Sequence, residues 1–198
     1  MSGIWSPDHQ AEDHLARART ALSDHRLEDA LHGLMEGFRR VQAAPPPGVP
    51  LPAGWPEADA LVHEVAGHFQ RIEMRRSSAV GPDVFVATRL YAVGGHTAVL
   101  NDYFRASDAN RKHILLTGLA GNASLNQALR IRLGDTAEAI EVCPFPGLVE
   151  TTSWLMDRLE HLAPRRIFLF HHPEDVPAVA AVAASGLEKC YMVHHADG

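Results

Sequence analysis

From residue 83 onward, short apolar segments alternate with helical patterns. The apolar segments cover about residues 84–87, 113–117, 139–142, 167–170 and 189–193. They are apolar throughout rather than at every second position, which is typical of strands buried on both faces of a parallel sheet. The sequence therefore predicts an α/β fold with a doubly wound, mostly parallel, five-stranded Rossmann-like sheet. Because crossover connections are right-handed, we expect the strand order 3-2-1-4-5.

The first 82 residues follow a different pattern. Helical periodicity on both sides of a polar turn at residues 23–26 predicts a helical hairpin within residues 1–43. The hairpin resembles a single tetratricopeptide-type unit, and such units normally stack, so we expect it to pack on the rest of the chain. Residues 44–82 read as a proline-rich linker followed by a helix that restarts at Pro56. The α/β domain then covers residues 83–198.

Composition excludes several classes of protein. The formal net charge of -6 and the scattered Lys and Arg residues argue against nucleic-acid binding. The two cysteines, Cys143 and Cys190, are too few for a disulfide framework, which fits a reducing compartment. No apolar stretch has the length of a signal peptide or a spanning helix. We expect a cytoplasmic protein, with peripheral contact to a membrane surface left open.

The strand order predicts where a ligand would bind. In open α/β sheets, ligands lie outside the carboxyl ends of the strands, where the order reverses. In the order 3-2-1-4-5, this reversal lies between the first and fourth strands. Residues 91–97 follow the first strand and residues 171–175 follow the fourth, so these two polar loops are predicted to be neighbours. Residues 194–198, after the fifth strand, are expected at the same edge.

The loop after the first strand reads Gly94-Gly95-His96-Thr97. Two glycines let a ligand approach the backbone closely, and the helix that follows directs its N–H groups toward an anion. The alternative is an ordinary strand-to-helix turn in which Thr97 is the N-cap. The dinucleotide fingerprint G-x-G-x-x-G is absent, which argues against a nicotinamide or flavin dehydrogenase.

The other two loops are rich in histidine and acids. His171, His172 and Asp175 follow the fourth strand, and His195 and Asp197 follow the fifth. These side chains suit general acid–base catalysis, and they also suit Zn²⁺ or Mn²⁺. A third alternative is a polar helix start, with Pro173 in the first turn. No nucleophile elbow is present, so catalysis by a serine nucleophile is not predicted.

Taken together, the segments 91–100, 171–175 and 193–197 resemble the acceptor-side domain of bacterial GT-B type glycosyltransferases. This resemblance implies a nucleotide-sugar donor, a glycan or lipid-linked acceptor, and no metal or other cofactor. It assigns catalytic roles to His96, His172 and Asp175. It assigns substrate binding to Gly94, Gly95, Thr97, His171, His195 and Asp197.

In that family a second domain supplies most contacts to the nucleotide sugar. We therefore expect the chain to be the N-terminal half of such an enzyme, or to need a partner subunit, and to be inactive alone. Two alternatives stay open. One is a metal-dependent hydrolase or phosphoesterase that uses the His and Asp loops. The other is a non-catalytic interaction module with an apolar groove on the hairpin.

Overall fold

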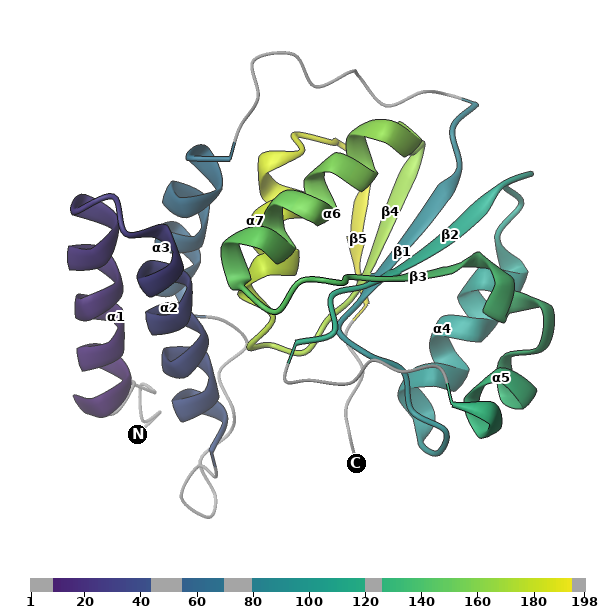
Figure 1. The fold of residues 1–198 in the computed structure, drawn as a ribbon, viewed down its shortest axis with the longest axis horizontal. Helices are drawn as coiled ribbons and strands as arrows, with labels where there is room; N and C mark the ends of the chain where they lie inside the picture. The colour runs from purple at the N-terminus through teal and green to yellow at the C-terminus, as the bar shows by residue number, and fades with distance from the viewer. Residues whose placement is uncertain (1–8, 44–54, 70–79, 120–125, 194–198) are drawn as a thin grey trace, which may run out of the picture.

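The structure, a computed structural model, describes residues 9–43, 55–69, 80–119 and 126–193. Its centre is a parallel five-stranded sheet with the order β3-β2-β1-β4-β5, which confirms the predicted fold class and strand order (Figure 1). The strands are β1 (Asp83–Ala87), β2 (Lys112–Leu116), β3 (Ile140–Val142), β4 (Arg166–Phe170) and β5 (Cys190–Met192).

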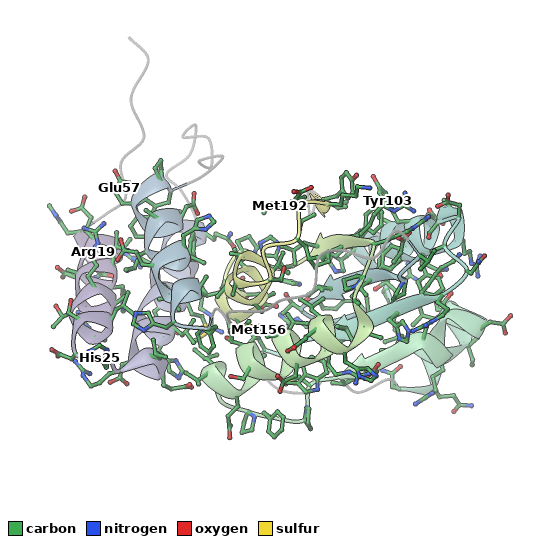
Figure 2. All side chains as sticks on the ribbon, turned by 90° about the horizontal axis from the view of Figure 1, so that it is seen from above. Arg19, His25, Glu57, Tyr103, Met156 and Met192 are labelled. Atoms are coloured by element: carbon green, nitrogen blue, oxygen red, sulfur yellow. The ribbon has the colours of Figure 1, made fainter. Side chains whose placement is uncertain are left out.

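Helices cover the two faces of this sheet (Figure 1). The first face carries α4 (Gly95–Ala106) and α5 (Gln127–Leu133), followed by the 3-10 helix η1 (Gly134–Ala139). The second carries α6 (Leu148–Leu162) and α7 (Val176–Ala184). Seen from above, Met156 of α6 lies on one side of the sheet, whereas Tyr103 of α4 lies on the other (Figure 2). None of the helices in the described ranges is long and apolar enough to span a bilayer.

The burial of the strands explains why the sequence forms this sheet. Every residue of β1 is buried, because β1 lies between β2 and β4 and has a helical layer on each side. The edge strand β5, in contrast, is exposed along its length. A strand in the central position needs apolar residues at every site, and the run Val84–Ala87 provides them.

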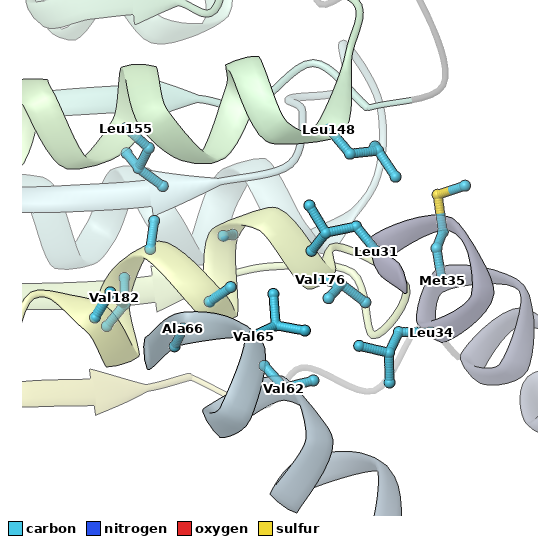
Figure 3. Packing of buried hydrophobic residues seen from close by; sticks show 14 of the residues in the cluster. Leu31, Leu34, Met35, Val62, Val65, Ala66, Leu148, Leu155, Val176 and Val182 are labelled. Carbon is cyan, nitrogen blue, oxygen red and sulfur yellow. The ribbon is translucent and has the colours of Figure 1, made fainter. Parts of the chain in front are cut away.

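The N-terminal region forms a third helical layer. It consists of α1 (His9–Ser23), α2 (Leu27–Gln42) and α3 (Pro56–Gly67). The two hairpin helices approach closely, since a Cβ atom on Gly33 would lie 2.9 Å from the Cβ of Ala18. Leu31 and Leu34 of α2 are buried and pack toward Val65 of α3 and Val176 of α7 (Figure 3). As expected, the hairpin packs on the rest of the chain, and its apolar residues share one core with the α/β domain.

A carboxylate clamp connects this layer to the sheet domain. Glu28 in the first turn of α2 accepts hydrogen bonds from the backbone N–H groups of Leu148 and Val149, both at 2.7 Å. These amides begin α6 and have no partner within that helix, so the carboxylate serves as its cap. The clamp therefore fixes the position of the hairpin against the helix that leads into β4.

Candidate functional site

The loop after β1 is held by hydrogen bonds that the linear sequence does not reveal. The backbone N–H of Tyr91 donates to the hydroxyl of Thr97 at 2.7 Å. Arg132 of α5 donates to the carbonyls of Ala92 at 2.7 Å and Gly94 at 2.6 Å. The loop is thus tied to α4 on one side and to α5 on the other.

The predicted glycine turn is open on its outer side. Gly94 is the N-cap of α4 and has a φ of 104°, a conformation that favours glycine. No atom lies within 4 Å of the position that a Cβ would take on Gly94 or on Gly95. Thr97 is fully buried and lies inside α4, so it is not the N-cap that the alternative of an ordinary turn assumed. The exposed glycines leave the N-terminal end of α4 open to solvent.

Beside this turn, two histidines and a tyrosine lie close together, from the loop after β1, the start of α4 and the loop after β4. The hydroxyl of Tyr91 lies 3.1 Å from Nε2 of His172. The imidazole centroids of His96 and His172 are 5.8 Å apart, and His96 also contacts the ring of Phe170 edge-on at 6.3 Å. The two loops predicted to be neighbours are therefore in direct contact, at the point where the strand order reverses.

The predicted site residues differ in how far their side chains are exposed to solvent. His171 and His172 are each partly exposed, whereas His96 has only 4% of its surface exposed. Gly94 and Gly95 are exposed. His195 and Asp197 lie outside the described residues. Of the predicted catalytic residues, His172 is thus the one whose side chain is accessible in this structure.

Asp175 lies behind the cluster and is fully buried. Its carboxylate accepts hydrogen bonds from the hydroxyl of Thr88 at 2.7 Å, from the hydroxyl of Thr117, and from the backbone N–H of Ala178 at 3.1 Å. The same Thr88 hydroxyl accepts a hydrogen bond from the backbone N–H of His172 at 2.8 Å. Asp175 therefore ties the ends of β1 and β2 to the loop that carries His172.

The start of α7 differs from the expected one. The sequence suggested a helix from about Pro173, with Asp175 in its first turn. In the structure Asp175 is the N-cap and the helix begins at Val176, with Pro177 in the first turn. Either proline suits a first-turn position, so the motif alone does not decide between them. The hydrogen bonds of Asp175 to Thr88 and Thr117 favour the later start.

Burial raises the pKa of Asp175 to about 6, although the hydrogen bonds from Thr117, Thr88 and the Ala178 amide oppose this shift. A raised carboxyl pKa favours the folded state at low pH, and this contribution is lost as the pH rises from about 4 through 6. We expect the unfolding free energy of Asp175→Asn, relative to the wild type, to increase between pH 4 and pH 7. Each unit of pKa difference corresponds to about 1.4 kcal/mol.

Urea unfolding at several pH values measures this effect. The pH-dependent difference between the two proteins is the relevant quantity, because the amide also changes the hydrogen bonds at every pH. Parallel pH profiles for the two proteins would show that Asp175 has an ordinary pKa.

The structure offers no metal site among its described residues. Within residues 9–43, 55–69, 80–119 and 126–193, no three His, Cys, Asp or Glu side chains are grouped to hold a metal ion. His194, His195 and Asp197, on which the metal alternative also depended, lie outside these ranges. The apolar groove that an interaction module would need on the hairpin is not available on the faces of Leu31 and Leu34, which are buried.

Comparison with known proteins adds no assignment: no family model, no curated protein and no solved structure matches this chain.

Proposed function

We propose that this chain is the acceptor-side half of a glycosyltransferase that moves a sugar from a nucleotide-sugar donor to an acceptor hydroxyl. One juxtaposition carries the proposal: the open Gly94-Gly95 turn and the accessible imidazole of His172 lie side by side at the reversal of strand order. Tyr91 connects them, because its backbone belongs to the turn and its hydroxyl contacts His172. A phosphate-binding turn beside a base is what sugar transfer from a nucleotide diphosphate requires.

The glycine turn suits the phosphates of the donor. Gly94 and Gly95 have no side chain between the backbone and the open space in front of them. The N–H groups of the first turn of α4 and the positive end of its dipole favour a negative charge there. When the bond between the sugar and the phosphate breaks, charge develops on the leaving diphosphate, and this turn would stabilise it.

His172 is assigned as the general base. An acceptor hydroxyl is a poor nucleophile at neutral pH until a base takes its proton. In the proposed step the acceptor oxygen bonds to the sugar carbon, the diphosphate leaves, and the proton passes to the imidazole. The hydroxyl of Tyr91 already lies 3.1 Å from Nε2, so an O–H group can approach this nitrogen closely.

Two buried residues support His172 rather than contact substrate. His96 packs beside its imidazole with ring centroids 5.8 Å apart. Asp175 holds Thr88, whose hydroxyl accepts the backbone N–H of His172. The proposal therefore makes His96 and Asp175 positioning residues. Turnover would also require a second domain or partner subunit that supplies the remaining contacts to the nucleotide sugar.

A glycine substitution tests the phosphate role. Gly95→Ala places a methyl group in the open space before the turn without a clash and without a positive φ. We expect the affinity for uridine diphosphate, measured by calorimetry, to fall by about tenfold or more, equal to about 1.4 kcal/mol. The fold should be retained, since nothing lies within 4 Å of the new Cβ.

Gly67→Ala is the matched control. Gly67 ends α3, away from the site, and also has no atom within 4 Å of its Cβ position. This variant should bind uridine diphosphate like the wild type. Equal affinity of the wild type and Gly95→Ala, or no measurable binding to the wild type, would remove the support for a phosphate-binding turn.

A further inference from the structure

Arg89, two residues beyond β1, has an arrangement that neither the fold nor the proposed base explains. Its guanidinium lies over the ring of Tyr91, 5.3 Å from the ring centroid. The side chain is half-buried, and its Nε atom is buried with no hydrogen-bond partner. A buried donor of this kind normally has an acceptor.

Other arginines in the described parts of the chain show the usual solution. Arg158 pairs with Glu141 at 2.7 Å through its terminal N–H group, although its Nε is also buried without a hydrogen-bond partner, and Arg165 and Arg166 both pair with Asp83. Arg132 donates to loop carbonyls. Among the described residues, no carboxylate lies within ion-pair distance of Arg89. Its charge is therefore not balanced by an ion pair within the described parts of the chain.

The position of this charge relates it to the candidate site. The Tyr91 ring under the guanidinium carries the hydroxyl that contacts Nε2 of His172. The same ring lies 5.9 Å from the imidazole of His172 and 6.2 Å from that of His96, measured between centroids. A sugar that presents a hydroxyl to His172 would therefore have its neighbouring substituents near Arg89.

A guanidinium recognises oxyanions better than other groups. Its planar fork of N–H donors matches a carboxylate or a phosphate, and such charge-assisted hydrogen bonds are stronger than neutral ones. Asp175, in the loop after β4, is fully buried and bound by Thr88, Thr117 and Ala178, so it is not available to Arg89. Because the chain carries a net charge of -6, an anionic ligand needs a local positive charge of this kind.

We infer that the acceptor is an acidic sugar, whose oxyanion is bound by Arg89 while its reacting hydroxyl faces His172. This inference rests on the proposed function and specifies its substrate class. The oxyanion is either the carboxylate of a uronic acid or the phosphate of a phosphorylated sugar.

Three sugars that differ at one carbon test the inference: glucose, glucuronate and glucose 6-phosphate. Each is titrated into the full chain, with inorganic phosphate as a fourth ligand, and binding is followed by NMR at the imidazole of His172 and the amide of Gly94. We expect at least one acidic sugar to bind about tenfold or more tightly than glucose. Preference for glucuronate identifies a carboxylate as the recognised group, and preference for glucose 6-phosphate identifies a phosphate.

Substitution of the arginine should remove this preference. In Arg89→Gln the ratio of affinities for the acidic sugar and glucose should fall to near one, and Arg89→Lys should keep part of it. Arg111→Gln is the control, because Arg111 is exposed and lies just before β2, at the opposite end of the sheet. This variant should keep the wild-type ratio. Unchanged spectra away from the site would show that each variant is folded.

The possible failures are distinguishable. If the three sugars bind equally, or if Arg89→Gln keeps the preference, the inference is wrong while the proposed function stands. The inference is also wrong if inorganic phosphate binds as tightly as glucose 6-phosphate and glucuronate does not bind, since the site would then recognise an isolated anion. If neither the sugars nor uridine diphosphate affects these resonances, the proposed function itself fails.

Discussion

Replacement of Asp83 by alanine is expected to destabilise the protein by about 3 kcal/mol, near the lower end of the range for loss of one partner of a buried ion pair. Asp83 is the first residue of β1 and its side chain is fully buried. Its carboxylate accepts hydrogen bonds from Ser107 at 2.6 Å, from Nε of Arg165 at 2.9 Å, and from Arg166. Both guanidiniums are partly exposed, so water would relieve part of the loss.

Asp83 should also make stability depend on acid. Burial raises its pKa, but the hydrogen bonds from Arg166, Arg165 and Ser107 outweigh this effect and lower the pKa to about 2. A lowered carboxyl pKa stabilises the folded state above about pH 4, and this contribution is lost as the pH falls toward 2. Urea unfolding of the wild type and Asp83→Ala should therefore give free energies that converge below pH 4.

The control for Asp83 is a carboxylate in an exposed pair. Asp24 lies 3.2 Å from Arg26, and both side chains are more than half exposed. Exposed pairs contribute about 0–1 kcal/mol, so Asp24→Ala should cost less than 1 kcal/mol. A loss in Asp83→Ala as small as that in Asp24→Ala would show that the pairs of Asp83 contribute no more than surface contacts.

Gly81→Ala should be the most disruptive glycine substitution among those considered. A Cβ atom on Gly81 would lie 2.1 Å from the carbonyl oxygen of Ala163 and 3.0 Å from the backbone nitrogen of Arg165. Neither can move away easily, because Arg165 donates its N–H to the carbonyl of Pro82 at 2.9 Å and Ala163 caps α6 in a left-handed conformation. We expect a loss of about 3 kcal/mol or more in unfolding free energy.

Gly67→Ala again serves as the matched control for Gly81→Ala. It has open space around its Cβ position, and alanine is favoured over glycine in a helix by about 1 kcal/mol at most. The melting temperature of Gly81→Ala should fall below that of the wild type. The melting temperature of Gly67→Ala should rise or stay the same. A melting temperature of Gly81→Ala equal to that of the wild type would show that the segment before β1 can shift to make room.

The sequence was sufficient to predict the sheet and the meeting of the two loops. The uninterrupted apolar run at Val84–Ala87 indicated a strand covered on both faces, and the order of crossovers followed from their handedness. That order placed the loop with Gly94 beside the loop with His172, and the contact between Tyr91 and His172 agrees with this prediction. Apolar runs and the alternation of strands with helices are local features that repeat along the chain, so they can be recognised from the sequence alone.

The contacts that shape the site were not predictable in this way. Arg132 binds the carbonyl of Ala92 across 40 positions in the sequence, and Thr117 binds Asp175 across 58. No periodicity or spacing signals such pairs. One signal is present in the sequence: Thr88 follows the apolar segment 84–87 and Thr117 ends the segment 113–117, which places both hydroxyls at the carboxyl edge of the sheet. The burial of His96 and Asp175 becomes visible only in the packed structure.

Mapping uridine diphosphate onto the full chain by NMR tests the central claim most directly. The account predicts that amide shifts will concentrate at Gly94 and Gly95 and imidazole shifts at His172, because phosphates at the start of α4 would lie beside that ring. Shifts confined to another surface, or no shifts at ligand concentrations that saturate a weak site, would contradict the claim that the carboxyl edge between β1 and β4 is the site of sugar transfer.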